Sequence, residues 1–280
     1  MAAVRILVAE GNAPEARRRV VATTGATASD GYAAVLRRLA PNATVDVCFP
    51  SDPDPRLPAA LESYAGVAVT GSALNIHRRE PESLRQIDFA RAAFALGLPM
   101  FGSCWGLQLA VVAAGGEVAQ NPRGREVAFA RRVTLTDAGR GHPMHAGRPV
   151  VFDAPAIHAD EVVALPHATI VTATNAMSQI QAAEICVGRS VFWGVQYHPE
   201  YGLGDVAATV RRCGQTLVDE GFFASLNDLE AYAKDVSTLG VDPSRRDIAW
   251  RLDIGRELLA EEERVREIAN WIAHQLRGGE

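Results

Sequence analysis

Short apolar runs alternate with longer amphipathic stretches along the first hundred residues. Buried-strand patterns occur at residues 4–8, 45–49, 66–70 and 99–101. Residues 81–96 instead repeat apolar side chains at helical spacing, and Gly97 supplies a stop signal. We expect a crossover helix that leads into a parallel strand, which is the signature of an α/β fold.

The pattern changes after Arg125, where strand-like pieces follow one another closely with turn residues between them. They are residues 127–136, 150–152, 169–173, 180–187 and 190–196. This half predicts a more antiparallel sheet that returns to the core at residues 193–196. A helix over residues 205–220 is expected to close a main domain of residues 1–221.

A charged, helical segment follows Gly221. Ser225 with Asp228 three residues later is typical of a capping box, and it predicts a helix to about Leu239 that Gly240 and Pro243 break. The last stretch, residues 245–276, places one apolar face on Val265, Ile268, Ala269, Ile272 and Leu276. We expect this helical C-terminal extension, residues 222–280, to cover an apolar surface of its own chain or of a partner.

Composition and charge exclude several classes of protein. With 280 residues and 48% hydrophobic side chains, the chain is long enough to bury a full core. The net charge of −5, with scattered Lys and Arg, offers no basic stripe for nucleic acid. No apolar run approaches the ~20 residues that cross a membrane, and the first run is interrupted by Arg5. A cytoplasmic protein is expected.

The minor cysteine and histidine candidates favour structural roles. The four cysteines show no Cys-x-x-Cys spacing, so neither a disulfide framework nor a cysteine zinc site is indicated. Cys48 and Cys186 lie in strand patterns and Cys213 in a helical one, which predicts small core side chains. His142 and His145 lie among glycines and a proline, and we interpret them as surface residues rather than metal ligands.

The strongest chemical signal is the segment of residues 99–116, where a strand passes into a helix through a turn at Cys104. Gly102 and Gly106 flank the cysteine, as a nucleophile elbow requires when the nucleophile has a strained backbone. The helix N-terminus would favour an anionic, exposed sulfur. A buried cysteine in an ordinary turn is the usual alternative, and the paired glycines argue against it.

A possible base lies at the end of a later apolar strand. His198 and Glu200 are two residues apart, so on an extended segment both face the same side, and Pro199 ends the strand between them. A carboxylate in this place would orient the imidazole and stabilise its protonated form. Alone, such a pair is more often structural, but with the elbow it predicts a Cys104–His198–Glu200 triad.

These two segments resemble the class I (triad-type) glutamine amidotransferases, most closely the amidotransferase domain of GMP synthase and its stand-alone relatives. The similarity runs from roughly residue 4 to residue 202. Its motifs are Gly-x-Cys-x-Gly-x-Gln and His-Pro-Glu, matched by Gly102, Cys104, Gly106, Gln108, His198, Pro199 and Glu200. The resemblance implies a flavodoxin-like α/β fold with a mixed central sheet flanked by helices.

Two further segments fit the same family. Residues 67–74 resemble the strand and Gly-Gly-Pro oxyanion loop, with Gly71 kept but Ser72 and Ala73 in place of the second Gly and the Pro. The resemblance implies an oxyanion hole made by the Ser72 and Trp105 amides, although a plain strand-to-helix turn is the alternative.

Residues 156–166 are similar to the family's Ser-His-x-Asp-x-Val segment beside the glutamine pocket, with Ile157 replacing the Ser. By this analogy His158, Asp160 and Gly71 shape the substrate pocket, and Gln108 contacts the amino-acid end of bound glutamine. A loop brace is an equal alternative for His158 and Asp160.

The resemblance implies a cysteine-dependent glutaminase that releases ammonia or an amine from the γ-amide of glutamine through a γ-glutamyl thioester. No metal or organic cofactor is expected. Relatives of GMP synthase carry an ATP-using domain downstream, so a separately encoded synthetase is one expected partner, and a homodimer is possible. The alternatives are a free-standing hydrolase of γ-glutamyl amines or peptides, and an inactive regulatory or assembly module. Retention of all three triad residues counts against the inactive module.

Overall fold

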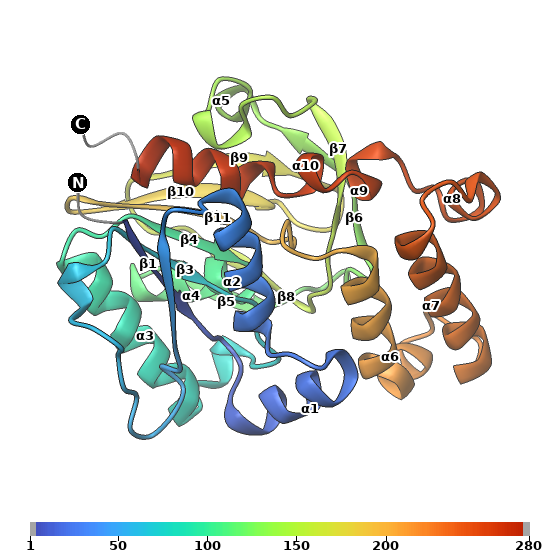
Figure 1. Ribbon diagram of the computed structural model, residues 1–280, viewed down its shortest axis with the longest axis horizontal. Helices are drawn as coiled ribbons and strands as arrows, with labels where there is room; N and C mark the ends of the chain where they lie inside the picture. The colour runs from blue at the N-terminus through green and yellow to red at the C-terminus, as the bar shows by residue number, and fades with distance from the viewer. Residues whose placement is uncertain (1–3, 277–280) are drawn as a thin grey trace.

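Alternate side chains of the first strand face opposite sides of a central sheet in the computed structural model, which describes residues 4–276. In β1 (Arg5–Ala9), Ile6 and Val8 belong to one apolar cluster and Leu7 and Ala9 to another. Both faces of this strand are therefore covered, which explains why it is a continuous apolar run. The same holds for the neighbouring strands and produces a helix–sheet–helix arrangement (Figure 1).

Within residues 4–276 the central sheet has nine strands, in the order β2-β1-β3-β4-β11-β10-β9-β6-β7. The parallel half consists of β1, β2 (Thr44–Cys48), β3 (Gly66–Val69), β4 (Met100–Ser103) and β11 (Ser190–Val195). The antiparallel half consists of β10 (Ala182–Val187), β9 (Thr169–Thr174), β6 (Phe129–Leu135) and β7 (Val151–Pro155). The mixed α/β sheet and the return of the chain to the core at β11 are confirmed.

A second, smaller sheet pairs β5 (Glu117–Gln120) with β8 (Asp160–Ala164) in antiparallel fashion. The apolar pattern does not predict these strands. Each is short, with exposed side chains at both ends of β5 and at the last two positions of β8, so neither has a long apolar run. The pairing nevertheless fixes the segment that holds His158 and Asp160.

Helices cover both faces of the central sheet. On one face, α2 (Ala28–Leu39) and the C-terminal α11 (Arg266–Trp271) share an apolar cluster with β1, β4 and β11. On the other face lie α3 (Pro81–Ala95) and α4 (Trp105–Ala113). The predicted crossover helix is confirmed as α3, and Gly97 follows it with a φ of 73°, a conformation that favours glycine.

The remaining helices lie at the edges of the sheet (Figure 1). They are α1 (Pro14–Thr24), α5 (Asp137–Arg140), α6 (Leu203–Asp219), α7 (Leu226–Val241), α8 (Arg246–Leu252), α9 (Arg256–Leu259) and α10 (Glu261–Arg264). Single turns of 3₁₀ helix occur at Leu61–Ser63, Ile76–Arg78 and Pro143–His145, and a π-helical turn at Ile272–Leu276. Helices α6 and α7 pack side by side and share a third apolar cluster.

Two details of α7 differ from the sequence expectation. Ser225 does cap the helix, since its hydroxyl accepts the Asp228 amide, but the Asp228 carboxylate bonds that hydroxyl rather than the Ser225 amide, so the capping box is incomplete. Gly240 does not break the helix, which ends at Val241. A Cβ at Gly240 would lie 3.1 Å from the Leu203 Cβ, so the glycine allows α7 to approach α6 closely.

The C-terminal extension covers its own chain. Val265, Ile268, Trp271 and Ile272 are buried in the cluster that contains Phe101 and Trp193 of the central sheet. The extension is broken into short helices rather than one, and its buried Glu267 pairs with Arg148 at 2.7 Å. Of the two occupants expected for the apolar face, the chain's own sheet is the one observed. The domain boundary at residue 221 stays a prediction.

In the described part of the chain, residues 4–276, no helix is both long and apolar enough to cross a membrane.

Candidate active site

Cys104 lies between β4 and α4, in the turn predicted as a nucleophile elbow. Its backbone has a φ of 52° and a ψ of −101°, a strained conformation for a residue other than glycine. The Cys104 amide donates to the Val195 carbonyl at 2.7 Å, which ties the turn to β11. The residue is only 6% exposed, so the sulfur is less open than expected, but Cys104 lines a cavity.

The two glycines of the elbow are needed because strand and helix approach closely. A Cβ at Gly102 would lie 2.7 Å from the carbonyl carbon of Gly106, and a Cβ at Gly106 would lie 2.7 Å from the Val69 oxygen. Real Cβ atoms do not come this close to backbone atoms. The Gly-x-Cys-x-Gly spacing therefore follows from packing as well as from the strain at Cys104.

His198 and Glu200 form the pair that their spacing predicts. The His198 Nδ1 and Glu200 Oε1 atoms are 2.8 Å apart, and both side chains are buried. The Tyr201 ring stacks on the imidazole, with 4.1 Å between ring centroids and 9° between planes. On the side of the oxyanion loop, a Cβ at Gly71 would lie 2.5 Å from the His198 Cε1 atom. The imidazole is thus held between Tyr201 and Gly71.

The environment of His198 favours its protonated form. Burial alone would lower the pKa of the imidazole, but Tyr201, Glu200 and a hydrogen bond to the Cys104 sulfur outweigh burial, and the pKa lies well above its ordinary value. A protonated imidazole beside a cysteine is the arrangement that supports a thiolate nucleophile.

Two main contacts surround the Cys104 sulfur. The Gln196 amide nitrogen lies 3.5 Å from Sγ, and Sγ lies 3.8 Å from the Ile157 carbonyl oxygen. Gln108 lies behind them: its amide nitrogen donates to the Gln196 side chain and to the Asp160 carbonyl, both at 3.2 Å. Gln108 therefore supports the Cys104 sulfur through Gln196, and its expected contact with substrate stays a prediction.

The loop at residues 71–73 is held by polar residues that follow β1 and β3. The Asn12 side chain accepts the Ala73 amide at 3.0 Å and donates to Glu10 at 2.8 Å. The Glu10 carboxylate also accepts the Ser29 amide at the start of α2. The Thr70 hydroxyl donates to the Gly71 carbonyl at 2.9 Å. This bracing fixes the backbone that precedes and follows Ser72.

The amides proposed for the oxyanion hole are free to bind a ligand. Among residues 4–276, neither the Ser72 nor the Trp105 amide donates to another group. Ser72 and Ala73 also have negative φ values in this part of the chain, so the loop does not need the second Gly of the family pattern. The replacements therefore put no strain on the loop.

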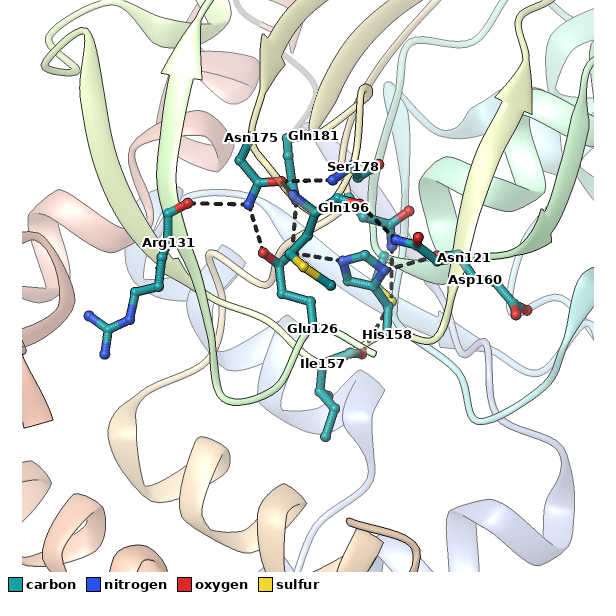
Figure 2. Close-up of polar contacts among 12 residues, drawn as sticks. Asn121, Glu126, Arg131, Ile157, His158, Asp160, Asn175, Ser178, Gln181 and Gln196 are labelled. Carbon is teal, nitrogen blue, oxygen red and sulfur yellow. Dashed lines mark hydrogen bonds and ion pairs between the residues drawn. The ribbon is translucent and has the colours of Figure 1, made fainter. Parts of the chain in front are cut away.

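His158 and Asp160 belong to a buried network on the other side of Cys104. Figure 2 shows His158 between Glu126 and the Asp160 backbone, with each ring nitrogen 2.9 Å from its partner. The Asp160 carboxylate accepts from Asn75 at 2.8 Å and lies 3.3 Å from His77. These contacts match the loop-brace alternative, and the network holds the Ile157 carbonyl against the sulfur. A role in substrate binding stays a prediction for both residues.

A cavity of about 370 Å³ opens beside Cys104 and His198. Helices α1, α2 and α6 form its far wall, and the lining includes Tyr32, Arg125, Ile157, Tyr201, Asp205, Arg212, Cys213 and Thr216. Cys213, predicted to be a core residue, is half-buried: it packs against the α6–α7 apolar cluster and also lines the cavity. Cys48 is a core residue, and burial raises the pKa of its thiol to about 12, while Cys186 is half-buried beside Glu184.

The interpretation of His142 and His145 as surface residues is wrong. His142 is largely buried, 3.1 Å from Glu184, and His145 is fully enclosed, 3.0 Å from the Thr172 hydroxyl. The glycine- and proline-rich segment that contains them lies beneath α11, so its burial cannot be predicted from local composition. Between residues 4 and 276, no group of three or more His, Cys, Asp or Glu side chains is arranged to hold a metal ion.

The sequence motifs do not predict several residues that build the site. Glu10 and Asn12 directly follow a buried parallel strand, a place where polar residues often serve a site, and this signal is present in the sequence. Gln196 and Tyr201 flank the His-Pro-Glu motif, but nothing in their type shows that one contacts the sulfur and the other the imidazole.

Comparisons with known proteins agree with this geometry. The family model described as glutamine amidotransferase class-I matches residues 35–212. A γ-glutamyl-L-1-hydroxyisopropylamide hydrolase from Pseudomonas sp is 41% identical over 98% of this chain and 94% of its own length. A GMP synthase from Thermomicrobium roseum is 33% identical over 45% of this chain, but only 24% of that protein is matched.

A solved glutamine amidotransferase structure from Thermotoga maritima has the same fold, with a TM-score of 0.62 and 18% identity, over 99% of both chains. The family model covers more than half of this chain, and the Pseudomonas hydrolase matches it almost from end to end. The chain therefore belongs to the class I glutamine amidotransferase family and is a cysteine-dependent amidohydrolase.

Proposed function

We propose that this protein hydrolyses γ-glutamyl amides of amines larger than ammonia, without a synthetase partner, through Cys104, His198 and Glu200. The observation that carries the proposal is the cavity of about 370 Å³ on the His198 side of Cys104. A volume of this size is in the range of about 300–1,000 Å³ typical of small-molecule sites. Ammonia as the leaving group would not require it.

The position of the cavity supports its assignment to the leaving group. A general acid must come within hydrogen-bond reach of the nitrogen that it protonates, so the scissile nitrogen lies next to His198. The substituent on that nitrogen then extends into the space lined by His198, Tyr201 and helices α1, α2 and α6.

The reaction follows from these positions. The Cys104 thiolate attacks the γ-carbonyl carbon, and the amides of Ser72 and Trp105 bind the resulting oxyanion. The carbon–nitrogen bond breaks as the His198 imidazolium gives its proton to the leaving amine, and Glu200 keeps the ring oriented. Water then loses a proton to the neutral imidazole and attacks the thioester, which releases glutamate and restores the thiolate. Side chains and backbone amides of this protein, water and the substrate supply every group in these steps.

The Pseudomonas relative supports a free-standing hydrolase over a nitrogen-donor subunit. Its name describes the hydrolysis of a γ-glutamyl amide, and the similarity spans both chains almost completely. The GMP synthases resemble this chain only over a part that is about a quarter of their own length. Of the functions that the sequence leaves open, hydrolysis of γ-glutamyl amines is therefore preferred to glutamine hydrolysis for a synthetase.

The test uses the purified protein alone with glutamine and a panel of γ-glutamyl alkylamides, and it measures release of amine and glutamate. We expect turnover of the alkylamides with higher kcat/KM than that of glutamine, and none by Cys104→Ala. Turnover that is negligible for every substrate until a synthetase is added would overturn the proposal and favour the donor subunit.

A further inference from the structure

We infer that Arg212 determines which leaving group the enzyme accepts, by binding an oxygen acceptor, hydroxyl or carboxylate, on the departing amine. This inference rests on the proposed function and specifies its substrate class. Arg212 lines the same cavity as Cys104 and His198, on the wall formed by α6.

The Arg212 guanidinium is held in place by neutral groups. One terminal nitrogen donates to the Thr209 hydroxyl at 2.8 Å, one turn earlier on α6, and the other donates to the Thr23 hydroxyl of α1 at 3.1 Å. An arginine has five N–H donors in a rigid planar fork, so donors remain for a ligand. The two threonines orient the fork without neutralising it.

The charge of Arg212 has no protein counterpart. Among residues 4–276, no carboxylate lies within the 4.0 Å ion-pair distance of its nitrogens. Three other charged side chains of the cavity have ion-pair partners: Arg19 pairs with Glu15, Arg125 with Glu220, and Glu200 with His198. In the described part of the chain, Arg212 is thus a cavity cation without a carboxylate partner, and its charge is available to a ligand.

Asp205 also lines the cavity, but it is a weak counter-ion for Arg212. Its carboxylate accepts the Gly202 amide at 2.9 Å, at the start of α6. Burial, followed by the charge of Glu200, raises the pKa of Asp205, so both disfavour its ionised form. The cavity therefore provides a guanidinium and several hydroxyl groups around an apolar strip of Ala16, Val20, Ala28 and Ile157.

This combination fits an amine with a short carbon skeleton that ends in oxygen. The apolar strip suits the carbon atoms, and a guanidinium binds an oxygen acceptor by a charge-assisted hydrogen bond. A carboxylate accepts two such bonds from the planar fork and a hydroxyl accepts one. An amine that ends in a methyl group would leave the fork unsatisfied and desolvated.

Three substrates with one carbon skeleton separate these cases: the γ-glutamyl amides of isopropylamine, 2-aminopropan-1-ol and alanine. They differ only in one substituent, which is methyl, hydroxymethyl or carboxylate. We expect the intact enzyme to prefer one or both of the oxygen-bearing amides over the isopropylamide in kcat/KM. Loss of a hydrogen bond to a charged group in Arg212→Met should reduce that preference roughly 10- to 100-fold, through slower turnover of the oxygen-bearing amides and no loss of turnover of the isopropylamide.

Arg211→Met is the matched control. Arg211 is the neighbouring residue on α6, but its guanidinium pairs with Glu230 of α7 at 2.8 Å, away from the cavity. Its substitution should leave the order of the three substrates unchanged. Arg212→Lys keeps the charge but not the planar fork, and should restore part of the preference.

The outcomes distinguish the sources of the acceptor. A preference of the intact enzyme for the alanine amide identifies a carboxylate, and a preference for the amino-alcohol amide identifies a hydroxyl. The inference is overturned if the intact enzyme prefers the isopropylamide, a result that needs no variant to fold. It is also overturned if Arg212→Met changes kcat/KM for all three substrates by the same factor. Absence of turnover on all three substrates by the intact enzyme would instead contradict the proposed function.

Discussion

The guanidinium of Arg264 donates a 3.0 Å hydrogen bond to the backbone carbonyl of Tyr201. Arg264 belongs to the C-terminal extension, and the Tyr201 ring stacks on the imidazole of His198. The same guanidinium donates to the Leu258 and Leu259 carbonyls within the extension. The extension is therefore linked to the active site through one residue that touches His198.

Arg264→Met should impair catalysis through the position of His198. We expect kcat to fall about tenfold, the size of one lost hydrogen bond to a charged group, with KM little changed. Steady-state kinetics on a γ-glutamyl alkylamide provide the measurement, and Arg264→Lys should recover part of kcat.

Arg251→Met is the control for this prediction, because Arg251 is also in the extension but forms only an exposed pair with Asp235. A lower melting temperature of Arg264→Met with unchanged kcat would show that Arg264 acts on stability alone.

Cys104 should be the reactive cysteine of the cavity, although Cys213 also lines it. A glutamine analogue with a diazo-ketone side chain should label Cys104 and leave Cys213 unmodified, because burial raises the pKa of the Cys213 thiol and keeps it protonated. Peptide mass spectrometry of the labelled protein decides. Equal labelling of Cys213, Cys48 or Cys186 would be inconsistent with Cys104 as the nucleophile.

The local motifs predict the centre of the site well. The Gly-x-Cys-x-Gly segment predicts the strained backbone that Cys104 has. The two-residue spacing of His198 and Glu200 predicts that their side chains meet, and they lie 2.8 Å apart. Both depend on short stretches of chain whose geometry is set by strand and turn rules. Strands β1, β3, β4 and β11 are predicted for a similar reason, since each is a short, largely apolar run.

Contacts between distant segments are not visible in such patterns. Arg264 reaches Tyr201, and Glu267 reaches Arg148, only because the extension folds back over the sheet. The burial of His145 and the position of Cys213 at the cavity depend in the same way on what packs against each segment. Residue type alone favours a surface histidine and a core cysteine, but tertiary packing buries the histidine and leaves the cysteine half-buried.

The raised pKa of His198 predicts a pH-dependent contribution to stability. A histidine whose pKa is higher in the folded state than its ordinary value of 6.5 stabilises the fold fully below about pH 6.5. This contribution is lost as the pH rises through the folded-state pKa. The difference in free energy of unfolding between wild type and His198→Ala should therefore shrink with increasing pH, as measured by urea unfolding at a series of pH values.

Glu200→Gln provides the control, because it keeps the shape of the side chain but removes the charge that favours imidazolium. The pH dependence of its free energy of unfolding should lie between those of wild type and His198→Ala. Its turnover should be impaired less than that of His198→Ala. If Glu200→Gln were inactive while His198→Ala still turned over substrate, the pair would be structural rather than catalytic.

Glu267 should make the extension sensitive to acid. Burial alone would raise its pKa, but Arg148 and His145 outweigh burial and hold the pKa at about 2. A carboxylate with a depressed pKa stabilises the fold above its unfolded value near 4.5, and that stabilisation is lost as the pH falls toward about 2.

Glu267→Gln should destabilise the protein by about 3–5 kcal/mol at neutral pH, because it leaves the Arg148 guanidinium buried without a charge partner. The loss should become smaller below pH 4.5. Urea unfolding at pH 7 and pH 4 measures both values, and an equal loss at the two pH values would contradict the assigned ion pair.

The central claim is that Cys104 carries the γ-glutamyl group while the amine leaves past His198. Rapid mixing of purified protein with a γ-glutamyl alkylamide, followed by acid quenching and mass spectrometry of the Cys104 peptide, tests it most directly. The account predicts one glutamyl group bound as a thioester at Cys104, formed together with about one equivalent of free amine and without any partner protein. Amine release at an unchanged rate by Cys104→Ala, with no adduct on Cys104 in the wild type, would contradict it.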